Sequence, residues 1–368
     1  MTAFVWRFLL ALICCCLQMG GCGAGKQSAD RSEASSSSAP SNGKDSGNSD
    51  GSDYHFFRIP SSILQEKDDV ASSTKTNATA TAKNAYDQVA KQLAGLHVPD
   101  DRLNDPSAIN YAKFIAEEWD SLMKASLSPI SGWAEEHVTP FVGDVKVVFY
   151  PFGGPDIAYA VRFFPTAQSY VLVGLEPIGN FDSIKNEVRS ASLLASVEGA
   201  ISYFLHHGFF VTYDMITQLS HKNTKGGLCL ILLELARLGF DINSVENISI
   251  NAGGLEVANE SNALRCIKII FNKAGESILR TVYYVKADLQ NSRDGRVICL
   301  KKFLERAPVV TLVKSASYAM HDSAFSQIRD FILSNTRLLL QDDSGIPFHY
   351  FNSLRWEKYI FGEYTVPT

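Results

Sequence analysis

The segment between Val145 and Glu176 limits the choice of fold more than any other part of this sequence. It contains an apolar strand at 145–150, a glycine-containing turn at 151–156, a helix at 157–164 and a second apolar strand at 170–175. Pro165 ends the helix, because proline has no amide hydrogen and its ring clashes with the preceding turn. Short apolar strands that alternate with helices are typical of an α/β sheet with parallel neighbours. We therefore predict an α/β fold.

This unit resembles the opening of Rossmann-type nucleotide folds and of their methyltransferase variant. In those folds a glycine turn brings backbone amides close to the ligand, and an acidic residue about 20 positions later binds a ribose hydroxyl. Here Gly153 and Gly154 lie in the turn, and Glu176 follows Gly153 by 23 residues. The full G-x-G-x-x-G pattern is absent, and Pro155 removes an amide that a phosphate would need. The resemblance implies a Rossmann-like (methyltransferase-like) fold, and we expect no cofactor.

The remaining elements predict a mixed sheet flanked by helices, with an N-terminal helical extension. Helices are expected within 82–137, at 184–205, 228–238 and 297–304, and through 325–331, and strands at 248–251, 265–272, 279–288, 309–314 and 337–341. Short connections between the three strands from 248 to 288 indicate antiparallel neighbours. The aromatic-rich segment 348–364 is expected to pair as an edge strand or to cover one.

The N-terminus predicts export and a membrane anchor. Arg7 precedes an apolar run at 8–17. A run this short falls below the roughly 20 residues of a membrane span and is typical of a secretory signal. Met19-Gly20-Gly21-Cys22 resembles the bacterial lipoprotein box, in which the signal is cleaved before a cysteine that carries lipid. An ordinary cleaved signal peptide with an incidental cysteine is the alternative.

These patterns divide the chain into four segments. Residues 1–21 form a lipoprotein signal peptide, 22–53 a disordered Ser/Gly-rich tether, 54–143 the helical extension and 144–368 the α/β domain. The tether has no aromatic residue to bury, so it cannot offset the entropy of ordering. We expect an envelope protein whose partner is the lipid bilayer, held by acyl chains on Cys22. If the host has two membranes, the outer one is expected.

Charge and cysteine content exclude further classes of partner and site. The net charge is −5, whereas a nucleic-acid surface needs a basic face, so we expect no nucleic-acid partner. After Cys22, three cysteines remain, each in an apolar segment: Cys229, Cys266 and Cys299. Isolated cysteines in an odd number make a poor disulfide framework, so we expect buried free thiols.

Two polar clusters follow predicted strands, at 314–321 and at 341–347. If the strands at 145–150, 170–175, 309–314 and 337–341 are parallel, both clusters lie at one sheet edge, where open α/β sheets bind ligands. The candidate catalytic residues there are Asp156, Glu176, Lys314, His321, Asp342 and Asp343. The candidate ligand-binding residues are Tyr150, Gly153, Gly154, Ser315, Ser317, Gln341 and Ser344.

Each cluster also has a structural interpretation. The run Asp342–Gly345 is favourable turn chemistry, and Ser323 can cap the helix that follows it. The functional interpretation depends on paired carboxylates, because one can hold a proton while its neighbour stays ionised. His206-His207 lie at a predicted helix end, where the helix dipole already favours histidine. We expect no metal site.

Four strings, YPFGGPD, GLEPIG, KSASYAMH and QDDSGIPF, resemble the recurring motifs of an uncharacterised family of exported bacterial lipoproteins. The likeness covers residues 145–364. No activity is established for that family, so the resemblance implies only that these strings matter, and it directs mutation to the six candidate catalytic residues.

Standard catalytic signatures are missing, including G-x-S-x-G, H-E-x-x-H and the P-loop. Three functions stay open. The first is a tethered module that binds a small or sugar-like ligand in a cleft at the strand C-termini. The second is an exported hydrolase that uses the carboxylates or His321. The third is a degenerate methyltransferase-like scaffold for protein contacts in the envelope.

Overall fold

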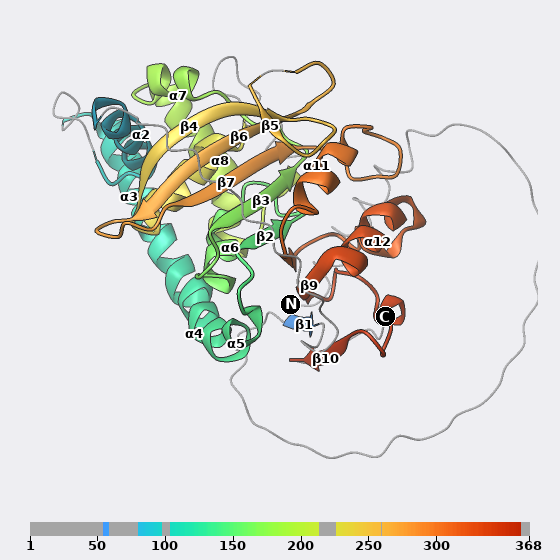
Figure 1. Ribbon diagram of the computed structural model, residues 1–368. Coiled ribbons are helices and arrows are strands. Elements are labelled where there is room, and N and C mark those ends of the chain that lie inside the picture. The colour runs from blue at the N-terminus through green and yellow to red at the C-terminus, as the bar shows by residue number, and fades with distance from the viewer. Residues whose placement is uncertain (1–53, 59–79, 98–103, 213–225, 259, 362–368) are drawn as a thin grey trace, which may run out of the picture. The chain divides into compact units, whose positions relative to one another are not determined.

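A mixed sheet in the order β10-β1-β9-β8-β2-β3-β7-β6-β4-β5 organises the described part of the chain (Figure 1). The computed structural model describes residues 54–58, 80–97, 104–212, 226–258 and 260–361. The predicted signal peptide and the whole of the predicted tether, including Cys22, lie outside these ranges. The described residues belong to one unit, Asp50–Thr368.

The strands are β1 (Tyr54–Arg58), β2 (Val147–Tyr150), β3 (Ser169–Gly174), β4 (Phe240–Ile250), β5 (Glu256–Val257), β6 (Leu264–Lys273), β7 (Arg280–Lys286), β8 (Val309–Val313), β9 (Thr336–Asp342) and β10 (Glu357–Ile360). The α-helices are α2 (Ala80–Leu93), α3 (Pro106–Leu122), α4 (Ser128–His137), α5 (Thr139–Val142), α6 (Ile157–Phe163), α7 (Phe181–Glu187), α8 (Ala191–His207), α10 (Leu228–Arg237), α11 (Val297–Leu304) and α12 (Ser326–Asn335). Shorter turns are the π-helical η3 (Met123–Leu127) and the 3₁₀ helices η4 (Ala319–His321), η5 (Ser323–Phe325) and η6 (Phe348–Tyr350).

The centre of the sheet is parallel. Strands β9, β8, β2, β3 and β7 all run in the same direction. Every residue of β8 is buried, as is usual for a strand that has packed layers on both faces. The predicted α/β fold with a mixed sheet flanked by helices is therefore confirmed.

Antiparallel strands extend the sheet on both sides. β7 pairs with β6 and β6 with β4, as the short connections predicted, and the three long strands lie side by side in Figure 1. On the other side, β1 pairs with both β9 and β10, so the segment expected at an edge supplies the edge strand β10. The prediction that β4 starts at 248 was wrong, because the strand begins at Phe240 and polar residues at its partly exposed positions hide the alternation.

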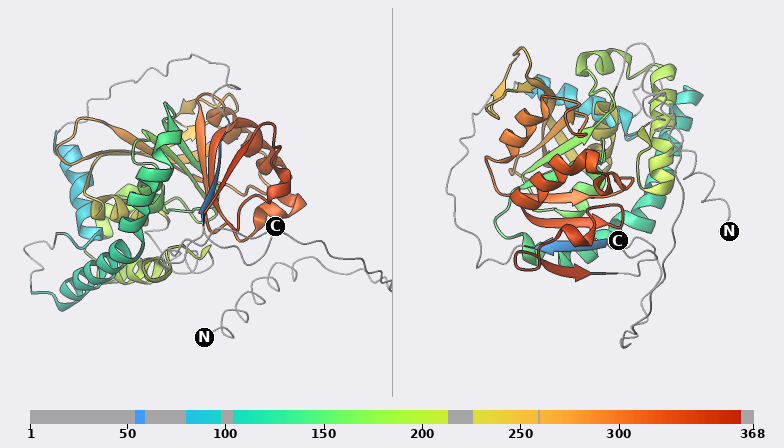
Figure 2. Two further views of the ribbon diagram at one scale, coloured as in Figure 1. Left: turned by 90° about the horizontal axis from the view of Figure 1, so that it is seen from below. Right: turned by 90° about the vertical axis from the view of Figure 1, so that its right-hand side faces the viewer.

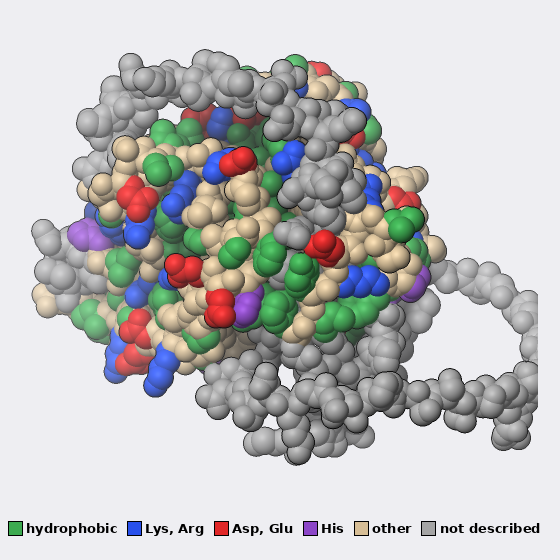
Figure 3. All heavy atoms as spheres, turned by 60° about the horizontal axis from the view of Figure 1, so that its bottom comes forward, with side chains coloured by type: hydrophobic (Ala, Val, Ile, Leu, Met, Phe, Trp, Pro, Cys, Tyr) green, Lys and Arg blue, Asp and Glu red, His purple; other side chains and the backbone are tan. Residues whose placement is uncertain are grey.

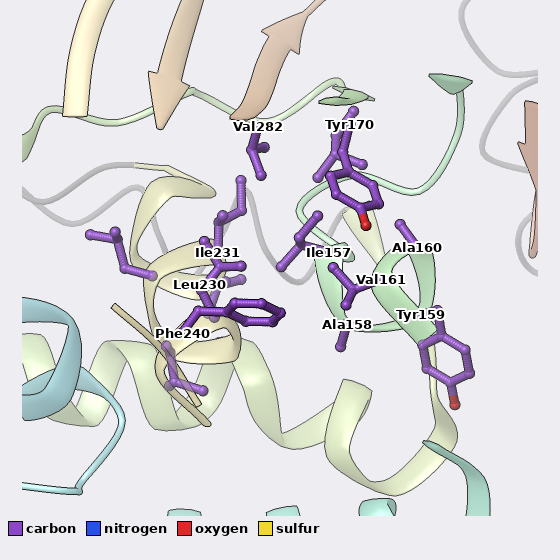
Figure 4. Packing of buried hydrophobic residues seen from close by; sticks show 14 of the residues in the cluster. Ile157, Ala158, Tyr159, Ala160, Val161, Tyr170, Leu230, Ile231, Phe240 and Val282 are labelled. Atoms are coloured by element: carbon purple, nitrogen blue, oxygen red, sulfur yellow. The ribbon is translucent and has the colours of Figure 1, made fainter. Parts of the chain in front are cut away.

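Helices cover both faces of the sheet. One hydrophobic cluster joins alternate strand residues, such as Val148 and Leu172, to α2, α3, α4, α6, α8 and α10. The second joins the intervening residues, such as Phe149 and Val171, to α11 and α12. Figure 2 shows α12 on one side of the strands and the teal and green helices on the other. In Figure 4, apolar residues of α6 and α10 pack together beneath the strands.

The helices before residue 143 belong to this packing. Val89, Ile115 and Trp119 are buried in the same cluster as the central strands. The described part of the predicted helical extension therefore covers one face of the sheet, while its first described residues form the strand β1. The three cysteines of the described ranges are buried thiols outside any disulfide, as predicted. None of the helices in those ranges has the length and apolar character needed to cross a membrane.

The single long helix predicted at 184–205 is two helices, α7 and α8. Ser190 adopts an extended conformation between them, and its hydroxyl accepts a hydrogen bond from the Leu193 amide (3.2 Å). The apolar spacing continues through this break because both helices pack on the same core. A capping serine therefore decides the boundary, and the apolar periodicity does not reveal it.

We predict that Ser190→Ala lowers the free energy of unfolding by about 1 kcal/mol, because the first turn of α8 loses its cap. Chemical denaturation of the wild type and the variant measures the change. Ser196→Ala, at a partly exposed position inside the same helix, is the matched control and should change stability by less than about 0.5 kcal/mol. Equal losses in the two variants would contradict the role of Ser190.

Candidate functional site

The predicted clusters share one edge of the sheet. Because β2, β3, β8 and β9 are parallel, the turn after Tyr150 and the turn after Asp342 open at the same end of the strands. The chain continues from β2 to β3 on one side of β2, and β8 lies on its other side. The carboxyl ends of β2 and β8 therefore flank the point at which the strand order reverses, where open α/β sheets bind ligands.

A buried ion pair joins the two sides of this point. Lys314, which follows β8, donates from Nζ to Oδ2 of Asp156, which follows β2 (3.3 Å). The same Asp156 oxygen accepts the hydroxyl proton of Tyr150 (2.9 Å), and Oδ1 caps α6 by accepting from the Tyr159 amide (3.0 Å). Asp156 is 1% exposed and Lys314 5% exposed.

The remaining donors of Lys314 are also engaged. Its ammonium group donates to the carbonyl oxygen of Gly208, at the end of α8. It lies 3.9 Å from the centre of the Tyr159 ring, which adds a cation–π contact. Lys314 therefore connects β8, α6 and α8, and its charge is used inside the protein.

Glu234 is a part of this network that the sequence analysis missed. It is fully buried in α10, and its Oε2 accepts from the Ala158 amide (2.8 Å), so Glu234 and Asp156 together occupy the first amides of α6. The signal was present in the sequence, because Glu234 is the single charge within the apolar run 228–235. Such a residue is seldom buried unless it is paired or neutral.

The two carboxyl groups share one lysine, so their charges compete. Burial and the charge of Asp156 raise the pKa of Glu234 well above its ordinary value. Burial also raises the pKa of Asp156, and the Lys314 ammonium opposes that rise. Asp156 accepts three hydrogen bonds, whereas Oε1 of Glu234 has no partner in the described residues. We conclude that Glu234 holds the proton and that Asp156 carries the charge.

Glu176 lies in a separate pair. Its Oε1 accepts the hydroxyl proton of Tyr284 from β7 (2.6 Å), and its Oε2 accepts from the Leu175 amide (3.1 Å). Burial raises the pKa of Glu176 and the Tyr284 hydrogen bond opposes this. A Cβ at Gly174 would lie 2.3 Å from Glu176 Oε1, and one at Gly227 would lie 2.6 Å from the Tyr284 ring. Glycines thus make room for the pair, and Glu176 makes no hydrogen bond with Asp156.

The predicted glycines of the first turn serve packing as well. A Cβ at Gly153 would lie 2.3 Å from the ring of Tyr150, so the glycine lets this tyrosine reach Asp156. Gly154 has a φ of +57° and donates its amide to the Val173 carbonyl oxygen (3.1 Å), which ties the turn to β3. Neither glycine leaves the turn open in the way that a dinucleotide site requires.

The second cluster joins two loops. Asp342 accepts from the Ser315 amide (2.6 Å) and from the hydroxyl of Ser344 (2.6 Å). The Ser344 hydroxyl oxygen in turn accepts from the Ala316 amide (2.7 Å). Gln341 forms two hydrogen bonds with the backbone of Ile346, each 2.8 Å long. Gln341, Asp342 and Ser344 therefore fix the turn after β9 to the loop after β8.

The loop after β8 is conformationally strained. Ser315, Ser317 and Tyr318 have φ angles of +53°, +50° and +58°, a region that residues with a Cβ seldom occupy. Each such residue costs of order 1 kcal/mol and persists only where surrounding contacts hold it. Here Asp342 and Ser344 hold the start of the loop. Strain of this kind is frequently found at binding and active sites.

The end of this loop carries the accessible groups. Tyr318 is 43% exposed, and its hydroxyl donates to Oδ2 of the exposed Asp343 (2.7 Å). The ring of His321 lies 5.2 Å from that of Tyr318, edge to face. Burial lowers the pKa of His321, so the imidazole is neutral near pH 7. We call Ser317, Tyr318, His321 and Asp343 the rim.

The structure thus divides the candidates into three groups. Tyr150, Asp156 and Lys314 form the ion-pair network; Gln341, Asp342, Ser315 and Ser344 join the loops; Ser317, His321 and Asp343 form the rim together with Tyr318, which the sequence analysis did not select. The other three candidates lie outside these groups: Glu176 pairs with Tyr284, and Gly153 and Gly154 shape the first turn. In the described ranges no group of three or more His, Cys, Asp or Glu side chains could hold a metal ion. His206 instead lies 3.3 Å from Glu118 and bonds the Ser202 carbonyl of its own helix.

Charges of both signs alternate on the face drawn in Figure 3, and its described residues form no basic patch there.

Comparison with known proteins gave no match: no family model, no curated protein and no solved structure is significantly similar to this chain. The resemblance of the four strings to a lipoprotein family therefore stays a prediction.

The proton on Glu234 makes stability depend on pH. An unfolded glutamate ionises near pH 4.3, whereas the folded protein keeps this proton to higher pH, so stability falls as pH rises above that value. We predict that Glu234→Gln removes this loss, which for one retained proton is about 1.4 kcal/mol per pH unit. Urea denaturation between about pH 5 and about pH 8 measures the slope.

The matched control is Glu135→Gln, at an exposed position of α4, which should leave the slope unchanged. Glu234→Gln should approach the wild type in stability at the acidic end and exceed it at the basic end. Parallel curves for the wild type and Glu234→Gln would mean that Glu234 is ionised in the folded protein.

Proposed function

We propose that this protein is an exported, lipid-anchored binding protein that holds a small or sugar-like ligand at the rim and does not turn it over. The anchor is the predicted acyl group on Cys22. The observation that carries the proposal is the division of polar groups at the sheet edge. The buried carboxylates are consumed by internal hydrogen bonds, whereas Tyr318 and Asp343 are exposed on a strained, firmly held loop.

The strand order supports the finer, Rossmann-like description of the fold. Numbered along the chain, the parallel strands β2, β3, β7, β8 and β9 lie in the order 3-2-1-4-5, which is that of Rossmann folds. An antiparallel strand, β1, follows β9 and separates it from β10. This extension is in keeping with the methyltransferase-like variant.

The chemistry of the crevice argues against a nucleotide ligand. In Rossmann folds the pyrophosphate binds the amides at the first helix N-terminus. Here Asp156 and Glu234 occupy those amides, and an ion pair joins Lys314, which follows β8, to Asp156, which follows β2. A phosphate would have to displace two buried carboxyl groups. We infer a methyltransferase-like scaffold whose binding surface is the rim instead.

The rim has the chemistry of a site for a polyhydroxyl ligand. The Tyr318 ring offers a flat apolar surface, while Asp343 and the Ser317 hydroxyl offer hydrogen-bond partners. Because Asp342 and Ser344 hold the start of the loop, less entropy is lost on ligand binding than for a loop without these hydrogen bonds. Preorganised aromatic and polar groups of this kind favour binding of a sugar face.

The hydrolase alternative has less support. A pair of catalytic carboxylates must reach the scissile bond. Asp156 and Glu176 are fully buried, each with a tyrosine hydroxyl and a backbone amide as partners. Asp342 is occupied by Ser315 and Ser344. His321 remains as a neutral base, but its Nε2 has no partner in the described residues, and the nearby Asp343 carboxylate accepts from Tyr318 instead.

We predict that at least one neutral mono- or disaccharide raises the melting temperature of the full mature chain, and that Tyr318→Ala weakens this binding by about tenfold or more. Tyr318 is exposed, so the variant should keep its stability within about 0.5 kcal/mol. A thermal-shift screen followed by titration calorimetry measures both quantities.

The matched control is Tyr203→Ala, an exposed tyrosine on α8, which should leave the affinity unchanged. Release of a cleaved product during the titration would favour the hydrolase. A complete lack of sugar binding would leave the scaffold for envelope contacts as the better proposal.

The anchor has a separate test. We predict that Cys22→Ala moves the protein from the membrane fraction to the soluble fraction or leaves its precursor unprocessed, with loss of palmitate labelling. Cell fractionation and metabolic labelling measure this. Cys16→Ala, inside the apolar run of the signal, is the control and should be labelled as in the wild type. Full labelling of Cys22→Ala would remove the anchor from the proposal.

A further inference from the structure

A buried guanidinium lies beside the rim. Arg329 of α12 is 5% exposed, and its Nη1 donates to the carbonyl oxygens of Met320 (2.8 Å) and Asp322 (3.4 Å). The centre of its guanidinium lies 3.8 Å from the ring of Tyr350, which follows the second loop. These contacts place a full positive charge directly behind η4, the turn that carries His321.

No carboxylate of the described residues neutralises this charge. The hydrogen bonds of Arg329 in those ranges go to two carbonyl oxygens, and its Nε is buried without an acceptor. Asp322 accepts from the Ala324 amide and Asp343 from Tyr318, while the adjacent Asp330 is exposed and interacts with Lys301. A buried charge without a counter-ion is costly, so it is usually kept for a purpose.

Two histidines adjoin the same charge. Nε2 of His321 is buried without a partner in the described residues. The ring of the exposed His349 lies 4.2 Å from that of Tyr350, the residue that stacks on Arg329. Burial lowers the pKa of His321, and the charges of His349 and Arg329 lower it further, against the Gly345 backbone and Asp343, so both cations lie within electrostatic reach of His321. They come from α12, η4 and η6.

We infer that Arg329, His321 and His349 form a subsite for an anionic group, a carboxylate or a phosphate ester, carried by the ligand that the proposed function places at the rim. The inference deepens that proposal by naming the ligand class as an acidic sugar or a sugar phosphate. An anion would supply the acceptor that Arg329 Nε and His321 Nε2 lack. The planar guanidinium fork suits carboxylate and phosphate oxygens alike.

The subsite also orients the ligand. Asp343 carries a negative charge on the Tyr318 side, so it repels the acid group and attracts hydroxyl donors. The anionic end would therefore lie against Arg329 and His349, and the neutral ring would lie on Tyr318. The subsite differs from the Lys314–Asp156 network, in which the cation already has its carboxylate.

The test is titration calorimetry on the full mature chain with four probes: glucose, glucuronate, glucose 6-phosphate and inorganic phosphate. We expect the two acidic sugars to bind at least about tenfold more tightly than glucose, since a hydrogen-bonded charge is worth that much or more. Preference for glucuronate over glucose 6-phosphate identifies a carboxylate ligand, and the reverse identifies a phosphate ester.

Two variants and a control assign the effect. His349→Ala, at an exposed position, and Arg329→Lys, which keeps the charge but loses the fork, should each weaken binding of the acidic sugars by about tenfold and leave glucose binding unchanged. His206→Ala, an exposed histidine on α8, should change neither. The melting temperature of each variant shows whether it is folded. If Arg329→Lys does not fold, the result for His349→Ala decides whether the subsite exists.

Equal affinity for glucose and the acidic sugars, lost in Tyr318→Ala, would overturn the anionic subsite while the binding function stands. An anion effect that persists unchanged in His349→Ala would also overturn it. If none of the four probes binds, the subsite is overturned, and the wider saccharide screen decides the proposed function separately.

Discussion

The ion pair between Lys314 and Asp156 is the contact on which the rest of the sheet edge depends. It connects the end of β8 to the cap of α6 across the reversal point of the sheet, and Lys314 also reaches the end of α8. The strained loop starts at the residue after Lys314, so a buried lysine sets where the loop leaves the sheet. Removing either partner would leave an unpaired buried charge, which typically lowers the free energy of unfolding by about 3–5 kcal/mol.

Buried and exposed polar groups at this sheet edge therefore have different roles. The carboxylates that the sequence analysis selected as catalytic candidates instead hold elements together, because they accept hydrogen bonds from tyrosine hydroxyls and a helix amide. Glycines make these contacts fit, as Gly153 does for Tyr150 and Gly227 does for Tyr284. In the proposed function, a ligand would meet the remaining aromatic and imidazole groups, among them the exposed Tyr318. Under that proposal, binding and stability depend on different residues of the same motifs.

Much of this architecture could be predicted because it follows from local patterns. The unit 145–176, the parallel strands and the antiparallel hairpins all reflect apolar runs and glycine turns. The break at Ser190 and the early start of β4 could not, because a cap and half-exposed polar positions leave the apolar spacing unchanged. For Glu234, the apolar run around it indicates a buried charge, but its partner could not be predicted. That partner, the Ala158 amide, lies 76 residues away, and no local pattern contains such a contact.

The strand β1 has a mechanical consequence. It is the first described element of the chain, and it is hydrogen-bonded on both sides, to β9 and to β10. Both pairings are antiparallel, so tension applied through the N-terminus would act along β1 and shear two ladders at once instead of peeling one. Shearing requires the hydrogen bonds of both ladders to break together, whereas peeling breaks them one after another. If the protein is held at its N-terminus, as proposed, a pulling force would reach the sheet at a strand that is paired on both sides.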